Sequence, residues 1–158
     1  MTLDWRPFFP GNSPRPLQAK TLDQIVDNWD KYDNFICELP PGVGKSHIAI
    51  TLSKWNQEMR KAEYPDDQYQ PASSYITTTS LYLEQQYMRD FEKLGLLDMH
   101  SADHFQCTFN TRLTCGEAAR LSSVVDMCSQ CTNCPYKIHK AKFIHQYKMG
   151  VVNLFYYL

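Results

Sequence analysis

A glycine-rich segment followed by Lys45 and Ser46 carries the first chemical signature of this 158-residue chain. Phosphate binding needs backbone amides turned toward the anion, which favours glycine at 42 and 44, and the N-terminus of a following helix adds attraction. In such a loop the lysine reaches the β- and γ-phosphates and the serine hydroxyl binds Mg²⁺. Leu39 stands where the full pattern has one more glycine. The alternative is a glycine turn that precedes Lys-Ser by chance. We predict an ATP and Mg²⁺ site made of Gly42, Val43, Gly44, Lys45 and Ser46.

Five of the six cysteines form the second signature, at positions Cys107, Cys115, Cys128, Cys131 and Cys134. Two-residue spacing between the last three lets neighbouring thiolates converge on one metal ion or cluster. A site of four ligands leaves one of the five spare. Zinc and a [4Fe–4S] cluster both take four thiolates, and the spacing by itself slightly favours zinc. Cys37 lies apart in an apolar run, where we expect a buried packing residue. His100, His104, His139 and His145 are ligands by type, but we expect them to be solvated.

The elements that must position these residues alternate between helix and strand. Helical spacing of apolar residues predicts helices, and runs of β-formers predict strands. The expected helices are 17–29, 44–62, 81–94 and 136–148, and the expected strands are 34–39, 74–78 and 151–158, with a polar loop at 63–73. This order is typical of an α/β fold with a parallel sheet and flanking helices. It lapses over residues 98–135, which predicts an inserted cysteine-rich subdomain.

Composition sets the class of protein. An apolar content of 43% supports a globular core. Residues 1–100 hold 10 Lys and Arg against 14 Asp and Glu, whereas residues 101–158 hold 6 against 3, so the later segment suits a polyanion. No stretch approaches the roughly 18 apolar residues of a membrane span, and the start lacks a secretory signal. We expect a cytoplasmic protein with no membrane partner, nucleoid-associated or nuclear according to its host, in which clustered cysteines hold metal rather than disulfides.

The motifs together resemble the first part of the XPD and DinG iron–sulfur DNA helicases of superfamily two, over nearly the whole chain. Arg15-Pro16-Leu17-Gln18 resembles the element whose glutamine recognises adenine, and Glu38–Ser46 resembles the phosphate loop. Tyr75–Thr79 with Leu81 and Gln85 resembles motif Ia. Phe105-Gln106-Cys107, Cys134-Pro135-Tyr136 and Val152–Leu158 resemble the cluster-binding segments and the strand after them. The Lys-Gly-Arg that usually precedes the first cysteine is missing.

The resemblance implies a partial RecA-like P-loop NTPase domain with three segments: an ATP-binding part over 1–97, an iron–sulfur insertion over 98–136, and a return to the motor domain over 137–158. It implies that Gln18 joins the nucleotide site and that Lys45 is catalytic. It also implies that Thr77, Thr79 and Gln85 bind single-stranded or forked DNA. Finally, it implies a [4Fe–4S] cluster rather than zinc. The ligands of this cluster would be Cys107, Cys115 and Cys134, with either Cys128 or Cys131 as the fourth.

The Asp-Glu-x-His box that completes ATP hydrolysis in this family does not occur in these residues. We therefore expect nucleotide and DNA binding from this chain alone, without ATP turnover, and the rest of a helicase or another protein as its partner. Two other hypotheses stay open. One is a non-enzymatic protein that binds DNA or a helicase, and the other is a zinc-binding P-loop regulator.

Overall fold

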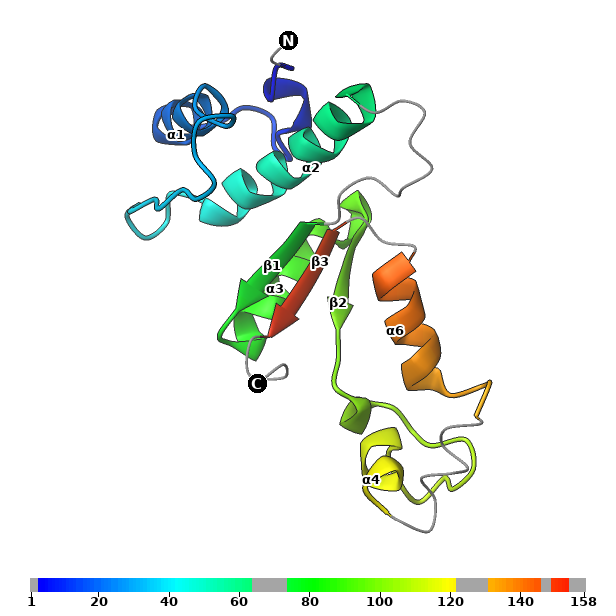
Figure 1. Cartoon of the computed structure of the whole chain (residues 1–158). Helices are drawn as coiled ribbons and strands as arrows, with labels where there is room; N and C mark the ends of the chain where they lie inside the picture. Colours follow the sequence, from blue (N-terminus) through cyan, green and yellow to red (C-terminus); the bar gives the residue numbers. More distant parts are fainter. Residues whose placement is uncertain (1–2, 64–73, 122–130, 146–148, 154–158) are drawn as a thin grey trace. The chain divides into compact units, whose positions relative to one another are not determined.

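The chain forms two compact units, Met1–Ser74 and Tyr75–Leu158 (Figure 1). The computed structural model describes residues 3–63, 74–121, 131–145 and 149–153. Within these ranges no helix is both long enough and apolar enough to cross a membrane. The glycine-rich loop belongs to the first unit and the clustered cysteines to the second.

The first unit is built from two α-helices, α1 (Pro16–Val26) and α2 (Lys45–Glu63), and a short 3-10 helix, η1 (Arg6–Phe8). Pro16 opens α1, a position where its missing N–H costs nothing. Both helices confirm the sequence predictions within a few residues. Their apolar faces meet in one core cluster, whose buried members are Trp5, Leu22, Val26, Ile48 and Trp55.

The strand predicted over 34–39 is wrong, because residues 34–40 adopt no regular structure. Ile36 is fully exposed, and Cys37 is exposed rather than buried. A strand is stable only when a neighbour accepts its backbone hydrogen bonds, and within the described residues no strand pairs with this segment. Two of its residues still pack locally: Phe35 stacks on Trp29 with ring centroids 5.9 Å apart, and Leu39 packs against the core cluster.

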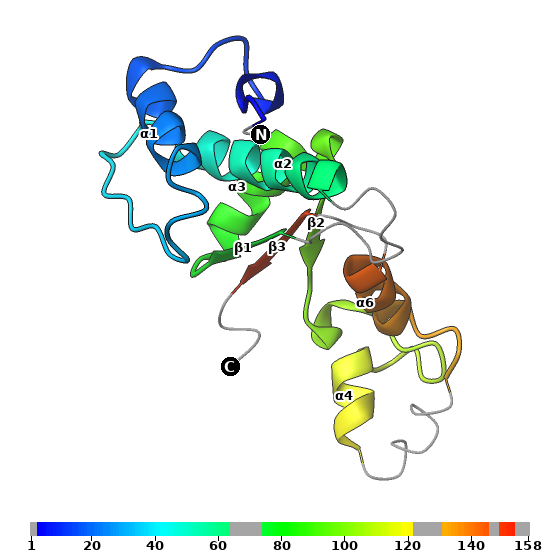
Figure 2. The ribbon, with the colours of Figure 1, turned by 45° about the horizontal axis from the view of Figure 1, so that its top comes forward.

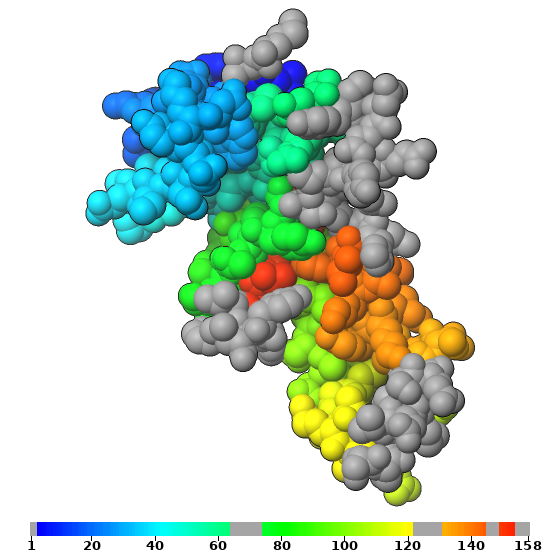
Figure 3. Space-filling model, in the orientation of Figure 1, coloured from blue at the N-terminus to red at the C-terminus, as the bar shows by residue number. Residues whose placement is uncertain are grey.

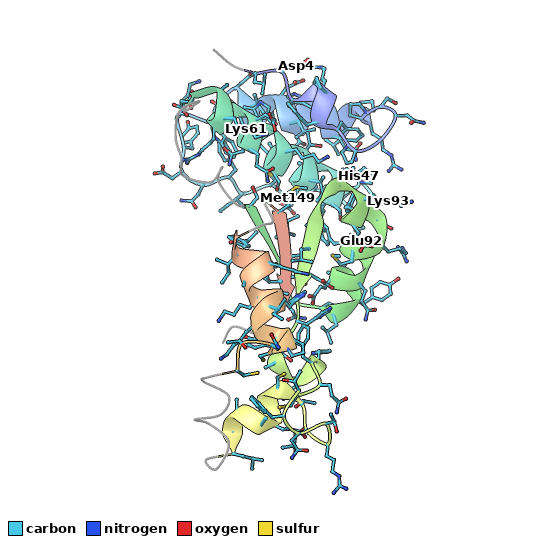
Figure 4. All side chains as sticks on the ribbon, turned by 90° about the vertical axis from the view of Figure 1, so that its right-hand side faces the viewer. Asp4, His47, Lys61, Glu92, Lys93 and Met149 are labelled. Carbon is cyan, nitrogen blue, oxygen red and sulfur yellow. The ribbon has the colours of Figure 1, made fainter. Side chains whose placement is uncertain are left out.

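The second unit contains a three-stranded parallel sheet in the order β1-β3-β2. Its strands are β1 (Ser74–Thr78), β2 (Leu96–Met99) and β3 (Met149–Asn153). The last strand in the sequence is thus the central one, as both ribbon views show (Figures 1 and 2). All five of its residues are buried, and its first residue, Met149, is labelled in Figure 4. The expected strands 74–78 and 151–158 are confirmed where they are described, whereas β2 was missed. Residues 154–158 lie outside the described residues.

Two helices flank this sheet, α3 (Leu81–Phe91) and α6 (Pro135–His145). Both confirm predicted helices, and a 3-10 turn, η2 (Glu92–Leu94), continues α3. Phe143 of α6 packs with Met99 and Val152, which are paired across β2 and β3. Side chains alternate between the two faces of a strand, so the residue before Met99, Asp98, belongs to the opposite face. This alternation assigns one face of the sheet to α6.

Gly150 explains how closely α6 approaches the sheet. A Cβ atom at this position would lie 2.4 Å from Cζ of Phe143, which is too close for a side chain. Glycine therefore lets the aromatic ring rest directly on the backbone of the central strand.

The cysteine segment lies between β2 and α6 in sequence. It holds a 3-10 turn, η3 (Ala102–His104), and a short helix, α4 (Cys115–Arg120). An isolated antiparallel bridge between Gln106 and Thr114 folds the chain between them back on itself. The interruption of the helix and strand order was expected over residues 98–135; β2 continues to Met99, and residues 122–130 lie outside the described residues.

Candidate functional site

The glycine-rich loop leads directly into α2, which begins at Lys45. Gly42 has a φ of 78° and Gly44 a φ of 87°, both in the left-handed region that glycine adopts at little cost. Lys45 is exposed and Ser46 half-buried. The predicted loop and the helix after it are therefore present, whereas the preceding strand is not.

Side chains from the start of α1 hold this loop. Arg15 donates from Nη1 to the Gly42 carbonyl oxygen at 2.6 Å, and Gln18 donates from Nε2 to the Gly44 carbonyl oxygen at 3.3 Å. The Gln18 Oε1 atom accepts from the Arg15 backbone N–H at 2.8 Å. Only 3% of Gln18 is exposed. In this conformation the side chain expected to recognise adenine instead fastens the loop to α1.

The loop fits a nucleotide phosphate group by its donor set. Two left-handed glycines shape its backbone, a long helix begins directly after it, and an ammonium and a hydroxyl occupy the first two helical positions. Helix N-termini attract anions because their first N–H groups have no partner within the helix. The side chains that would hold the phosphates and Mg²⁺ are Lys45 and Ser46.

Four cysteine side chains of the second unit line one cavity of about 280 Å³. They are Cys107, Cys115, Cys131 and Cys134. Cys107 and Cys115 are buried, and Cys131 and Cys134 are partly buried. The fifth predicted ligand, Cys128, lies outside the described residues. Four of the five predicted ligands are thus brought together from three separate parts of the segment.

The local fold explains how Cys107 and Cys115 face the same cavity. The Cys107 backbone N–H donates to the Leu113 carbonyl at 2.9 Å, and the Cys115 N–H donates to the Phe105 carbonyl at 2.7 Å. These bonds fold the intervening loop tightly. Cys115 is then the first residue of α4, whose N-cap, Thr114, accepts a hydrogen bond from the Glu117 backbone N–H at 3.1 Å.

Cys134 reaches the same place from the start of α6. Its Sγ donates to Sγ of Cys115 at 3.7 Å. Sγ of Cys131 lies 3.6 Å from the Thr108 hydroxyl. Burial first, and then the hydrogen bond with Cys134, raise the pKa of Cys115 to about 11. Without a metal this thiol therefore stays protonated at neutral pH, whereas thiolate ligands are deprotonated when a metal binds.

Aromatic and basic side chains surround the cavity. Phe105 and Tyr136 lie with ring centroids 5.9 Å apart and pack against the buried cysteines. Both rings therefore belong to the packing around the cysteines. Lys137 and Lys140 also line the cavity, and both are exposed. In the space-filling view, α4 and α6 form adjoining parts of the surface (Figure 3).

The residues expected to contact DNA lie around β1 and α3. Thr77, Thr79 and Gln85 are all exposed. Thr78, between the two threonines, is buried and donates from Oγ1 to the Ser80 carbonyl at 3.2 Å. The alternation of a strand thus presents Thr77 outward while Thr78 anchors the segment.

The histidines were expected to be solvated, and two of them are partly buried. His100 and His139 are half-buried, with ring centroids 5.9 Å apart. Nε2 of His139 lies 2.9 Å from the Asp98 carbonyl oxygen. Their burial follows from β2, which sequence patterns missed because it is only four residues long. His104 is exposed, and the His145 side chain lies outside the described residues.

Comparison of the chain with protein-family models, with characterised proteins and with solved structures gave no match.

Proposed function

We propose that this chain is the N-terminal part of an ATP-dependent iron–sulfur DNA helicase of the XPD and DinG kind. In this proposal the loop 42–46 binds ATP with Mg²⁺, and four cysteines hold a [4Fe–4S] cluster. One observation carries it: Cys107, Cys115, Cys131 and Cys134 come from distant positions and line a single cavity. The Cys-Pro-Tyr at 134–136 resembles the segment that carries the last ligand in the helicase cluster domain, and a glycine-rich loop with Lys45 and Ser46 precedes it in the same chain.

The resemblance to the helicases, rather than the geometry, favours a [4Fe–4S] cluster over a single zinc ion. Tetrahedral zinc with Zn–S bonds of about 2.3 Å holds its sulfur atoms about 3.8 Å apart. The Sγ atoms of Cys115 and Cys134, 3.7 Å apart, have such a separation. The metal content of the purified protein therefore distinguishes the two.

DNA binding in this proposal uses two surfaces of the second unit. The exposed Thr77, Thr79 and Gln85 contact the phosphates of a single strand. Lys137 and Lys140 extend that contact beside the cysteine cavity, because lysines bind the nucleic-acid backbone without regard to sequence. A bound cluster would supply a rigid cross-link at this point and a redox-active centre.

Lys45 holds and neutralises the terminal phosphates in the nucleotide site, and Ser46 binds Mg²⁺. No Asp-Glu-x-His occurs among the 158 residues, so the residues that position the metal and activate water are not supplied here. The proposed activity of this chain alone is therefore binding without turnover.

Metal analysis of protein purified without oxygen tests the proposal. We expect about four iron and four sulfide per chain. Cys115→Ser should abolish most of this content, and Cys37→Ser, which changes an exposed cysteine outside the cavity, should leave it intact. One zinc and no iron would contradict the proposal and favour a zinc-binding P-loop regulator.

A nucleotide titration tests whether the loop 42–46 binds ATP. A fluorescent ATP analogue with Mg²⁺ should bind the wild type at least tenfold more tightly than Lys45→Ala. Lys54→Ala, on the same helix, is the matched control and should bind like the wild type. Equal binding by all three proteins would show that the loop is not a nucleotide site.

A further inference from the structure

Glu84 of α3 is a buried carboxylate. Only 2% of the residue is exposed, and among the described residues neither of its side-chain oxygens has a hydrogen-bond partner. An ionised carboxylate in this position loses its hydration and gains nothing in exchange. The site therefore requires either a proton or a cation.

Two further ligand groups face Glu84. One oxygen of Glu84, one oxygen of Asp98 and one ring nitrogen of His100 lie within 4.8 Å of one another. His100 Nε2 is 2.8 Å from Asp98 Oδ2. The carboxylate of Asp98 lies close by, so an ionised Glu84 without a bound cation is still less stable. Burial and the Asp98 charge raise the pKa of Glu84 to about 7.

The topology of the sheet explains why these groups meet. Parallel strands end at the same edge of a sheet, and ligands bind preferentially at that edge. Asp98 and His100 lie at the carboxyl end of β2, and Glu84 lies in the first turn of α3, which directly follows the carboxyl end of β1. Asp98 belongs to the face opposite the one that α6 covers, the side on which Glu84 approaches.

Neighbouring rings hold His100 in place. Its ring centroid lies 5.2 Å from that of His104 and 5.9 Å from that of His139. His139 contacts the Asp98 backbone through its own Nε2. The imidazole is thus oriented before any ligand arrives, which lowers the cost of binding.

We propose that Glu84, Asp98 and His100 form a binding site for one divalent first-row metal ion, separate from the cysteine cavity. Two carboxylates and an imidazole suit Mn²⁺, Fe²⁺ or Zn²⁺, whereas thiolates select softer ions and clusters. Metal–ligand distances of about 2.0–2.2 Å place neighbouring ligands about 3 to 4 Å apart, so binding draws the three groups slightly together. The ion would tie α3 to the end of β2.

Manganese is the suitable probe, because the cysteines compete poorly for it. The full chain is loaded with its cysteine-bound metal, kept free of nucleotide, and titrated with Mn²⁺, while electron paramagnetic resonance measures the free ion. We expect one Mn²⁺ per chain. Glu84→Gln and His100→Ala should each weaken binding at least tenfold.

Glu92→Gln is the matched control, because it makes the same change at an exposed glutamate just beyond α3 (Figure 4). It should bind Mn²⁺ like the wild type. Equal Mn²⁺ affinity in the wild type and Glu84→Gln, or no binding to either, would overturn the proposal and leave Glu84 as a protonated buried acid. Iron and sulfide content is measured in the same samples, so failure of this site is distinguished from failure of the cysteine site.

Discussion

At the scale of single residues, Gly44 joins two requirements in one position. Its φ of 87° lies in the left-handed region, and a Cβ atom there would lie 2.5 Å from Nε2 of Gln18. Gly42 has a similar φ but no atom within 4 Å of such a Cβ. Comparing the same substitution at Gly42 and at Gly44 therefore distinguishes the cost of backbone strain from the cost of a steric clash with Gln18.

We predict that Gly44→Ala lowers the free energy of unfolding by about 2–4 kcal/mol, because strain and displacement of the buried Gln18 add together. Gly42→Ala should lose about 1 kcal/mol from strain alone. Urea unfolding of both variants measures the difference. Equal losses would mean that Gln18 moves aside without cost.

Glu84 makes a second prediction, for protein freed of divalent ions by a chelator. Its ordinary pKa of 4.5 applies to the unfolded chain, and the folded value is about 7. Between these pH values the folded state keeps a proton that the unfolded state releases, so the free energy of unfolding falls as the pH rises from 4.5 to 7.

Glu84→Gln should remove this fall and exceed the wild type in stability by about 3 kcal/mol at pH 8. Chemical unfolding at pH 5 and pH 8 measures it, with Glu92→Gln as the control. A wild type equally stable at both pH values would contradict the raised pKa.

The sequence predicts which residues could carry out chemistry more accurately than it predicts the structure around them. It selected five cysteines by their type and spacing, and four of them line one cavity, while Cys128 lies outside the described residues. It missed Glu84 and Asp98, since an isolated acidic residue carries no pattern until the strand ends are in place. It placed Cys37 inside, because an apolar run predicts burial only when another element covers it.

At the scale of elements, α4 depends on its N-cap. The helix is only six residues long, and Thr114 and Glu117 form a reciprocal pair: the Glu117 N–H donates to Thr114 Oγ1 at 3.1 Å, and the Thr114 N–H donates to Glu117 Oε2 at 2.8 Å. So short a helix is not stable alone. The capping box therefore sets the position of Cys115, its first residue.

Thr114→Ala should cost about 1 kcal/mol of stability and speed the loss of cysteine-bound metal to a chelator several-fold. Thr114→Ser keeps the hydroxyl and should lose metal at the wild-type rate. The decay of visible absorption after adding chelator provides the measurement. Equal rates in all three proteins would show that the cap does not position Cys115.

Helices were predicted more reliably than strands because helical periodicity is local. The helices α1, α2, α3 and α6 each have their hydrogen bonds within the element, and the sequence placed all four. A strand depends on a partner that a local pattern does not reveal. The run 34–39 has the composition of a strand but pairs with no strand in the described part of the chain, whereas the four residues of β2 pair with β3.

At the scale of the whole molecule, the two candidate sites belong to different compact units. We predict that damage to one leaves the other intact. Lys45→Ala should lose nucleotide binding and keep its full metal content, whereas Cys115→Ser should lose metal and bind the ATP analogue as tightly as the wild type. Measuring both quantities on both variants provides the check. A loss of both functions in either variant would show that the sites are coupled.

The position of β3 at the centre of the sheet has a consequence for the order of folding. β1 and β2 are synthesised first, yet the strand that joins them, Met149–Asn153, comes after the entire cysteine segment. Closing so long a loop is entropically costly and slows folding of parallel sheets. A metal centre that joins Cys107 to Cys134 would shorten that loop before β3 arrives. Loading the cysteines with metal would then accelerate refolding of this chain.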